Sequence, residues 1–283
     1  MLIVQIQCSR KKMSLFFENK VVWITGASAG LGEALAKEFA SEKAKLVLSA
    51  RRESELERVK KECARFISEE NILILPLDVT ELSNINMETQ KIIQKFGRID
   101  ILVNNTGASQ RSFAFETPIE VERRIMELNY FGHTIITKAV LPYMKKQKSG
   151  HIVVMSSIMG KFGFYRRSSY AASKHALHGY FEALRMEELE NNIYVSIICP
   201  GFVHTKISLN AMTETGQAYN KMDEGQETGM EPELVAKKIL KAVRNKTVEV
   251  LIGRSELMAP IVKRFFPRFF FWRIMHVSRK RTG

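Results

Sequence analysis

Short apolar runs alternate with longer amphipathic segments along most of this chain, and this alternation is the feature that most limits its fold. The apolar runs are rich in Val and Ile and are too short to be surface helices. They lie at 21–25, 45–50, 72–79, 101–105, 151–157, 195–200 and 248–253. Helix-like segments separate them, at 30–42, 53–69, 84–97, 119–148, 168–190 and 232–244. Strands that alternate with helices form βαβ units, so we predict an α/β fold with a parallel sheet covered by helices on both faces.

The chain of 283 residues has no Pro/Gly-rich linker and no break in composition, so we predict one domain over residues 18–253. The polar, turn-rich stretch 203–231 falls outside the alternation and is long enough to be a mobile substrate loop. Residues 1–17 form an N-terminal extension in which Met13 is a plausible true start. Its apolar stretch precedes its charges, the reverse of a secretory signal, and no run reaches the roughly 18 apolar residues of a transmembrane helix.

The formal net charge of +13 raises the question of an anionic partner such as nucleic acid or a membrane. The sequence contains no recognisable nucleic-acid module, so we favour a cytoplasmic enzyme with an anionic cofactor and a basic tail. The cysteines, Cys8, Cys63 and Cys199, lie far apart and form no Cys/His ligand pattern. This indicates reduced thiols and argues against structural zinc. The histidines show no paired-ligand motif either, and we expect no metal.

The sequence TGASAGLG follows the first apolar run and opens the first helix-like segment, with Thr25, Gly26, Gly30 and Gly32 in a TGxxxGxG pattern. Glycines at such a junction let the backbone turn tightly and approach a pyrophosphate, whose charge is favoured by a helix N-terminus. Any strand–helix turn can use glycine. In the first βα unit of an alternating chain, however, the cluster predicts a dinucleotide site.

The second apolar run ends in SARR, where NAD-specific sites usually carry an acid for the 2′-hydroxyl of the adenosine ribose. This chain offers Arg51 and no acid, and a guanidinium suits a 2′-phosphate by charge and by geometry. We therefore predict that NADP(H) is preferred over NAD(H); a solvated arginine at a helix start is the alternative. Asp78, after the third run, fits an adenine contact and a helix cap equally well. Asn104 and Asn105 fit either a ligand-facing loop or a turn.

The motifs TGASAGLG, LDVT, NNTG, SS at 156–157, YAASK and PG at 200–201 occur in the order and spacing of the short-chain dehydrogenases/reductases, which the chain resembles over residues 18–253. The resemblance implies a three-layer, Rossmann-like fold with a doubly wound, seven-stranded parallel sheet. One departure is NNTG for the commoner NNAG, which adds the hydroxyl of Thr106 at a small-residue position.

The same resemblance implies a catalytic tetrad of Asn129, Ser157, Tyr170 and Lys174. Ser157 is preferred over Ser156 because it lies 13 residues before Tyr170, the usual separation in this family. The full set of expected cofactor contacts is Thr25, Gly26, Ser28, Gly30, Leu31, Gly32, Arg51, Asp78, Val79, Asn105, Gly107, Tyr170, Lys174, Pro200, Gly201, Val203 and Thr205.

Tyr170 and Lys174 are spaced i, i+4 and so lie on one helical face. Taken alone, such a pair is more typical of a packed aromatic with a snorkelling lysine, but Ser157 and the glycine turn favour a catalytic role. We expect the Lys174 ammonium to lower the pKa of Tyr170. Tyr170 would then donate a proton to a carbonyl oxygen oriented by Ser157, while a nicotinamide supplies hydride. Asn129 would fix a water that connects Lys174 to solvent.

The C-terminal segment 254–283 mixes aromatic and basic residues, and Pro267 should divide it into two short helices. Aromatic side chains interleaved with cations suit a segment that lies on an anionic bilayer. One interpretation of residues 257–283 is therefore peripheral contact with the cytoplasmic face of a membrane. The alternative is that the aromatic face packs on the domain, covers the active site or forms an oligomer contact.

The sequence as a whole predicts an NADP(H)-dependent oxidoreductase that interconverts a carbonyl and a secondary alcohol, with Tyr170 as general acid/base. Apolar side chains outside the predicted strands suggest an apolar, lipid- or steroid-like substrate: Phe162, Phe164, Tyr165, Met212, Tyr219 and Met222. The alternatives are a 3-oxoacyl thioester reductase of fatty-acid-type metabolism and a non-catalytic NADP(H)-binding sensor. The resemblance implies a homodimer or homotetramer formed through the helices near 119–148 and 168–190.

Overall fold

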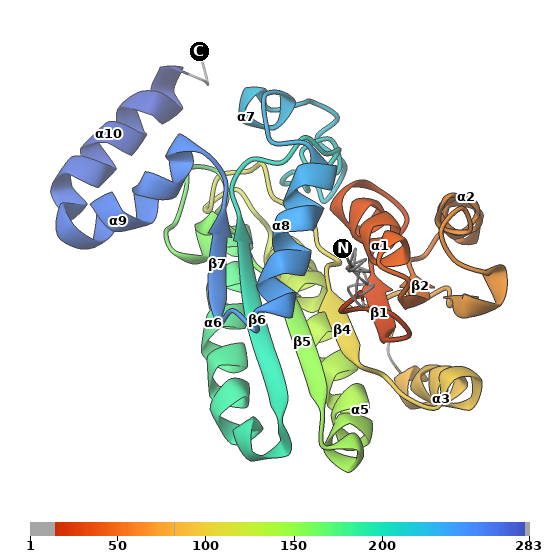
Figure 1. Cartoon of the computed structure of the whole chain (residues 1–283). Coiled ribbons are helices and arrows are strands. Elements are labelled where there is room, and N and C mark those ends of the chain that lie inside the picture. The colour runs from red at the N-terminus through yellow and green to blue at the C-terminus, as the bar shows by residue number, and fades with distance from the viewer. Residues whose placement is uncertain (1–14, 82, 281–283) are drawn as a thin grey trace, which may run out of the picture.

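The strands of the computed structural model form one seven-stranded parallel sheet, which confirms the predicted fold class (Figure 1). The structure describes residues 15–81 and 83–280, with side chains as far as His276. In the order β3-β2-β1-β4-β5-β6-β7, the strands are Ile72–Ile74, Lys45–Ser49, Val21–Thr25, Ile101–Asn104, Gly150–Met155, Ile193–Pro200 and Glu249–Ile252. The helices that connect the strands include α1 Gly30–Ser41, α2 Glu53–Cys63, α3 Ile85–Phe96, α4 Ile119–Met126, α5 Gly132–Gln147, α6 Ser168–Glu187 and α8 Pro232–Arg244.

Side chains alternate between the two faces of the sheet along β1, so each face has its own core. Val22 and Ile24 pack with α1, α2 and α8, whereas Val21 and Trp23 pack with α3, α5 and α6. Trp23 is fully buried, and its indole Nε1 donates to Ser49 Oγ at 2.8 Å, so its polar atom is satisfied. Burial on both faces explains why the strands read as continuous apolar runs.

The third strand is shorter than predicted and ends at Ile74 rather than at residue 79. Pro76 follows two residues after the end of the strand, and the N–H that it lacks would have faced away from β2. The amides of Leu75 and Leu77, on either side of it, donate to the carbonyls of Leu48 (2.9 Å) and Ala50 (3.1 Å). Beyond Ile74 the chain therefore continues beside β2 as a hydrogen-bonded loop, as far as the carboxyl end of β2.

The helix predicted over 119–148 is interrupted by a π-helical turn, Glu127–Phe131, between α4 and α5. π-Helical turns within α-helices are often associated with functional positions, and this one contains Asn129.

The domain core extends into the segment that was assigned to the N-terminal extension. Phe17 is fully buried, and its ring lies edge-to-face on Phe39 with centroids 5.0 Å apart. The domain therefore begins at or before Phe17 rather than at residue 18. Met13 and Cys8, with the rest of residues 1–14, lie outside the described residues.

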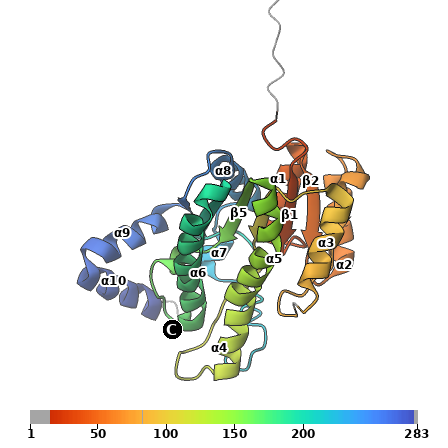
Figure 2. The ribbon, with the colours of Figure 1, turned by 90° about the horizontal axis from the view of Figure 1, so that it is seen from below.

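Two helices, α9 Met258–Phe265 and α10 Pro267–Lys280, follow the sheet and project from the domain beside α6 (Figure 2). They meet at Pro267, where the break was predicted. Phe270 is 3% exposed and packs edge-to-face on Phe162 with centroids 5.3 Å apart. The tail therefore rests on the segment that follows β5. In the part of the chain that the structure describes, no helix is long and apolar enough to cross a membrane.

Candidate active site

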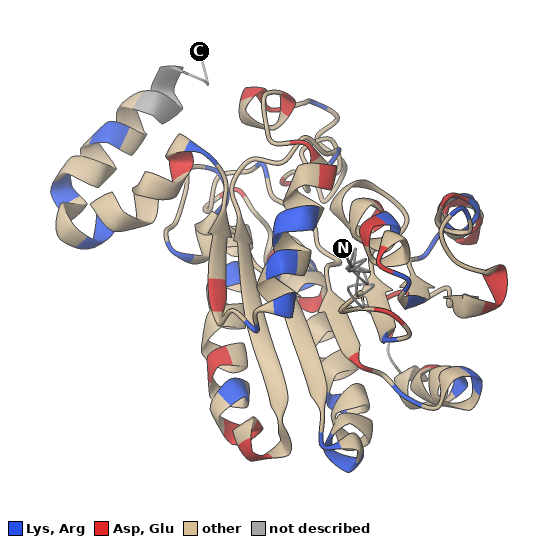
Figure 3. Ribbon diagram, in the orientation of Figure 1, with Lys and Arg blue, Asp and Glu red and all other residues tan. Residues whose placement is uncertain are grey.

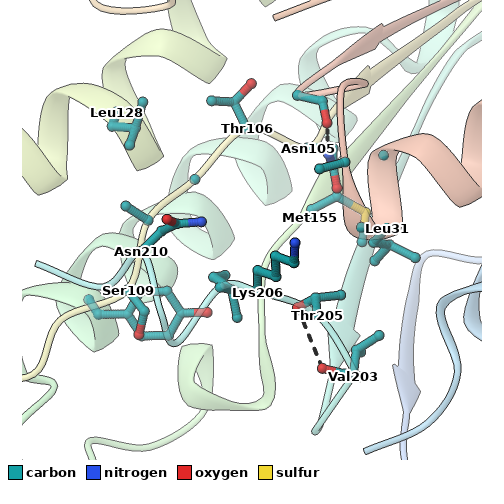
Figure 4. Close-up of a pocket in the computed structure, with 18 of the residues that line it drawn as sticks. Leu31, Asn105, Thr106, Ser109, Leu128, Met155, Val203, Thr205, Lys206 and Asn210 are labelled. Atoms are coloured by element: carbon teal, nitrogen blue, oxygen red, sulfur yellow. Dashed lines mark hydrogen bonds between the residues drawn. The ribbon is translucent and has the colours of Figure 1, made fainter. Parts of the chain in front are cut away.

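A cleft of about 1350 Å³ opens at the carboxyl ends of the strands. Ligands of open parallel sheets bind at this edge, where the strand order reverses, here between β1 and β4. Figure 4 shows part of the cleft, with Leu31, Asn105 and Thr205 from three separate elements around one space. The predicted site residues that line it are Gly26, Ser28, Gly30, Leu31, Gly32, Arg51, Asp78, Val79, Asn105, Gly107, Ser157, Tyr170, Lys174, Pro200, Gly201, Val203 and Thr205. Thr25 and Asn129 are fully buried behind its wall.

The glycine turn between β1 and α1 has the shape of a phosphate cradle. Gly26 and Gly30 have φ values of +66° and +56°, in the region that favours glycine. A Cβ on Gly32 would lie 2.1 Å from the Gly26 carbonyl oxygen, so the turn and the helix are in backbone contact. Among the described residues no side chain caps α1 at Ala29. No described side chain at the cap thus competes for the first-turn amides, and the site fits the pyrophosphate of a dinucleotide.

Thr25 supports the glycine turn from behind, which corrects its assignment as a cofactor contact. Its Oγ1 accepts hydrogen bonds from the backbone amides of Asn105 (3.0 Å) and Thr106 (3.2 Å). Asn105 Nδ2 in turn donates to the carbonyls of Thr25 (3.0 Å) and Gly26 (3.3 Å). Thr25 therefore positions the turn through β4, whereas Asn105 both holds the turn and lines the cleft.

Charged side chains gather at the end of the cleft formed by β2 and the loop after β3. The Arg51 side chain is 71% exposed, with Nη1 3.9 Å from Asp78 Oδ2. Asp78 Oδ1 accepts hydrogen bonds from the amide (2.9 Å) and hydroxyl (2.7 Å) of Thr80, so it closes a turn rather than capping α3. Arg58 also lines this end, but it is paired with Glu33 at 2.7 Å. The hydrogen bond from Arg58 lowers the pKa of Glu33 to about 2. Arg51 is thus the more available cation.

Ser157 and Tyr170 come from different elements, yet the Ser157 side chain lies close enough to the Tyr170 phenol to lower its pKa by hydrogen bonding. Ser157 follows β5, and its Oγ accepts a hydrogen bond from the Met159 amide at 3.2 Å. Tyr170 lies in the first turn of α6, where the amides of Ser169 (2.8 Å) and Tyr170 (3.3 Å) donate to Gln110 Oε1. This side chain caps the helix and fixes the position of Tyr170.

Burial raises the pKa of Tyr170 above its ordinary value, which is opposite to the predicted direction. The prediction counted the charge of Lys174 but not the cost of burying a phenolate. Hydrogen bonding from Ser157 and the charges of Arg111 and Arg167 act to lower the pKa of Tyr170. Lys174 Nζ lies 5.8 Å from the Tyr170 ring centroid and donates to the Met155 carbonyl at 2.7 Å. Burial lowers the pKa of Lys174 to about 8.

Asn129 holds the backbone behind the cleft. Its Oδ1 accepts from the Ala108 amide (2.8 Å), and its Nδ2 donates to the Ala108 carbonyl (2.9 Å) and to Ser173 Oγ (3.0 Å). A Cβ on Gly107 would lie 3.1 Å from Asn129 Oδ1 and 3.6 Å from Lys174 Nζ. The amide and the ammonium group therefore approach the same point, and only a glycine leaves that point open. A water between them stays a prediction.

Several charged residues of the cleft were missed by the sequence analysis. Arg111, Arg167, Lys206 and Asp223 all line it, and Figure 4 shows Lys206 extending into the space. Arg167 lies three residues before Tyr170, and Arg111 lies in the stretch NNTGASQRS, so nearness to a motif was a weak signal for both. Asp223 carries no local signal, because only the folded loop brings it to the arginines.

A second cluster, which the sequence did not reveal, brings His178, Cys199 and Glu249 together with one ligand atom of each within 4.8 Å of the others. Lys161 Nζ lies 2.6 Å from Glu249 Oε2 and 3.1 Å from His178 Nδ1. An ammonium group of the chain itself therefore interacts with both groups. His178 Nε2 faces Ser156 Oγ at 3.1 Å, so Ser156 belongs to this network. We interpret the cluster as an ion-pair network and propose no metal.

The fold and the cleft together define a class: a Rossmann-like α/β protein with a dinucleotide cradle and a Ser–Tyr–Lys group at the same edge of the sheet. The family described as short chain dehydrogenase matches residues 20–215. A "Dehydrogenase/reductase SDR family protein 7-like" of Anopheles gambiae is 44% identical over 268 residues, which cover 93% of this chain and 83% of the relative. The chain belongs to the short-chain dehydrogenase/reductase family and is an NAD(P)-dependent oxidoreductase.

Two further comparisons agree with this assignment. A "Dehydrogenase/reductase SDR family member 7B" of Danio rerio is 38% identical over 287 residues, which cover 100% of this chain and 92% of the relative. The crystal structure of a short-chain dehydrogenase from Streptomyces avermitilis superimposes with a TM-score of 0.78 at 26% identity, covering 94% of this chain and 100% of that one. The resemblance seen in the motifs is thus confirmed over nearly the whole chain.

Proposed function

We propose that this protein interconverts a carbonyl group and a secondary alcohol on an apolar substrate, with NADP(H) as the cofactor. The observation that carries the proposal is that Ser157, Tyr170 and Lys174 line one cleft with the glycine turn. When bound, the nicotinamide supplies or accepts hydride. The residues of the chain then have to bind the substrate, orient its oxygen and move a proton.

In the direction of reduction, Tyr170 donates its phenolic proton to the carbonyl oxygen as a general acid. The raised pKa of Tyr170 keeps it protonated near neutral pH. Ser157 donates a hydrogen bond to the same oxygen and stabilises the negative charge that develops there. Lys174, with a pKa of about 8, is mostly an ammonium at pH 7 and stabilises the phenolate left behind. A proton from solvent returns through the region that Lys174 shares with Asn129.

Replacing Tyr170 by Phe tests this mechanism, because it removes the proton donor and leaves the glycine turn unchanged. We expect kcat to fall by about 10²- to 10⁴-fold, measured as loss of NADPH absorbance with a panel of apolar ketones. The affinity for NADPH should change little. Near-wild-type turnover would refute the mechanism. A preference for 3-oxoacyl thioesters would favour the thioester reductase, and NADPH binding without turnover of any carbonyl compound would favour the sensor.

The proposed preference for NADP(H) rests on Arg51, which is exposed at the end of β2 and whose ion-pair partner among the described residues is Asp78, at 3.9 Å. The experiment compares kcat/KM for NADPH and NADH in the wild type and in Arg51→Ala. We expect the ratio to exceed one and to fall about tenfold or more in the variant, because a charge-assisted bond to phosphate is lost. Arg65→Ala, with the same loss of charge on an exposed side chain outside the cleft, serves as the control. A wild-type ratio below one would sink the assignment.

We also propose that α9 and α10 contact the cytoplasmic face of a membrane. The exposed aromatic side chains of these helices and of the residue between them are Phe265, Phe266, Phe269, Phe271 and Trp272. The two helices contain Lys and Arg but no Asp or Glu (Figure 3). This combination of aromatic and basic side chains suits an anionic lipid surface.

The membrane contact is tested by co-sedimentation of the full chain with phosphatidylserine/phosphatidylcholine vesicles. The double variant Phe269→Ser/Trp272→Ser should lose most of the bound fraction. Phe115→Ser, which changes an 87% exposed phenylalanine elsewhere on the domain, should not. Equal sedimentation of all three proteins would remove the proposal.

We further propose that the protein is a homodimer or homotetramer formed through α4, α5 and α6. Exposed apolar side chains on and between these helices include Ile119, Phe131, Ile135 and Met186. Placing a charge at such a contact opposes association, because the charge would have to be buried unpaired. Analytical ultracentrifugation of Phe131→Glu should show a smaller species than the wild type. A monomeric wild type would exclude the proposal.

A further inference from the structure

Two arginines share one carboxylate in the wall of the cleft. Arg167 Nη2 lies 2.7 Å from Asp223 Oδ2, and Arg111 binds both oxygens of the same carboxylate, with Nε 3.3 Å from Oδ1. The side chains of Arg111, Arg167 and Asp223 are 5%, 11% and 22% exposed. Two nearly buried positive charges therefore face a single negative charge. Such an excess is costly unless a further anion joins the group.

The hydrogen bonds of the two guanidinium groups show which of them can accept another partner. Arg111 is almost fully used, because Nη1 donates to Ser109 Oγ and to the Gln110 carbonyl, both at 2.6 Å, in addition to its bonds with Asp223. Arg167 donates to Asp223 and, at 3.2 Å, to the Tyr165 carbonyl. These bonds use two of its five N–H groups. Burial and the charge of Arg111 lower the pKa of Arg167 to about 10, so the environment of Arg167 favours an additional anion.

The pair lies where a substrate would be placed for catalysis. Arg111, Arg167 and Tyr170 line the same cleft, and both arginines are close enough to influence the pKa of Tyr170. We call the part of the cleft around Arg111, Arg167 and Asp223 the substrate end. Among the described residues from 106 onward that line the cleft, Asp223 is the only acid, whereas the cationic side chains are Arg111, Arg124, Arg167, Lys174 and Lys206.

The acids that line the cleft elsewhere belong to its opposite end, at Glu33, Glu55, Asp78 and Glu81. The substrate end also contains apolar side chains, among them Leu128, Met159, Met212 and Met222. A wall that combines an excess of positive charge with apolar side chains favours a molecule that carries an apolar body and a negative charge. A purely apolar ketone would leave the excess positive charge desolvated and unpaired.

We propose that the substrate carries an anionic group, a carboxylate or a phosphate, which binds Arg167 beside the Arg111–Asp223 pair while the carbonyl faces Tyr170. This inference rests on the proposed carbonyl–alcohol activity and narrows its substrate class from apolar to apolar and anionic. The planar guanidinium matches either oxyanion in a bidentate manner. Because Asp223 lies in the loop 203–231, the same contacts hold this loop over the bound anion.

The experiment compares matched aryl ketones with NADPH: 4-acetylbenzoate, its methyl ester and 4-acetylphenyl phosphate. The wild type should have a higher kcat/KM for the two anions than for the ester. In Arg167→Met, the ratio of kcat/KM for each anion to kcat/KM for the ester should fall about 10- to 100-fold. The fall should come mainly from a higher KM for the anion, because a charge-assisted hydrogen bond is lost. Arg167→Lys should restore part of the ratio. Arg65→Met, which removes one exposed charge outside the cleft, should leave the ratio unchanged. The anion whose kcat/KM falls more in Arg167→Met identifies carboxylate or phosphate as the preferred group.

The inference is overturned if the wild type prefers the ester, or if the ratio is the same in the wild type and in Arg167→Met while thermal melting shows both folded. An arginine that only anchors the loop would give the second result. Calorimetric binding of the three ketones in the presence of NADP⁺ decides the inference even without turnover. Failure of the proposed activity has a different signature, namely NADPH oxidation that is absent for every ketone or insensitive to Tyr170→Phe.

Discussion

Replacing Ser157 by Ala should raise the apparent pKa of Tyr170 and so shift the pH profile of alcohol oxidation to higher pH. Burial raises the pKa of Tyr170, and the largest opposing influence is hydrogen bonding from Ser157. A hydrogen bond to a charged group contributes about 1.5–3 kcal/mol, and one pKa unit corresponds to about 1.4 kcal/mol. Loss of the hydroxyl should therefore raise the pKa of Tyr170 by about 1–2 units.

The shift is measured as kcat for NADP⁺-dependent oxidation of a secondary alcohol, over a pH series that runs from neutral to the highest pH at which the protein stays folded. Oxidation needs the phenolate to accept the alcohol proton, so kcat rises as the pH passes the pKa of Tyr170. In Ser157→Ala this rise should occur at higher pH, whereas reduction, which needs the phenol, should persist to higher pH.

Ser156→Ala is the matched control, because the Ser156 hydroxyl donates to the Lys174 carbonyl (3.3 Å) and faces His178. The control should leave the midpoint of the profile nearly unchanged. The reasoning is refuted if the midpoint of Ser157→Ala equals that of the wild type. It is also refuted if Ser156→Ala shifts the midpoint instead, since the catalytic serine would then be Ser156.

Other predictions concern cofactor binding and stability. Gly32→Ala places a Cβ 2.1 Å from the Gly26 carbonyl oxygen, so it should weaken NADPH binding in a fluorescence titration. At Gly179 an added Cβ would meet no atom of the described residues within 4 Å. Gly179→Ala should therefore leave NADPH binding intact and raise the Tm slightly. Phe270→Ala should lower the free energy of unfolding, measured in urea, by about 2–4 kcal/mol, because Phe270 is buried. Phe269 is 55% exposed, so Phe269→Ala should lower it by less than about 0.5 kcal/mol. Equal effects of the two substitutions would show that the tail is not docked. The pKa of Lys174 is about 8 in the folded protein, below its value in the unfolded chain. Above pH 8 the folded protein therefore binds fewer protons than the unfolded chain does. The wild type should therefore gain stability relative to Lys174→Met between about pH 8 and 10, by up to about 3 kcal/mol, and parallel stability curves would contradict this.

The sheet and the glycine turn could be predicted because their signals are local. A strand buried on both faces is a continuous apolar run, and a tight turn before a helix needs glycine at fixed positions. Tyr170 and Lys174 could be paired by their helical spacing. Burial of single aromatic residues near the termini could not be predicted in this way. Phe17 and Phe270 are buried by Phe39 and Phe162, and their own neighbourhoods in the sequence resemble exposed segments.

The charged wall of the substrate end could not be predicted either. Asp223 is 112 residues from Arg111 and 56 residues from Arg167, so no spacing rule connects them. The direction of the Tyr170 pKa was wrong for a related reason. The sequence shows a lysine one turn away, but it does not show how deeply the fold buries the phenol.

Pro76 has a consequence for the outer edge of the sheet, because the N–H that it lacks would have faced away from β2. β3 is an edge strand that pairs only with β2, and unpaired backbone groups on such an edge can add a strand from another molecule. Here the edge offers three residues before a proline that has no N–H to donate. Strand-by-strand growth of the sheet into fibres is therefore disfavoured at this side.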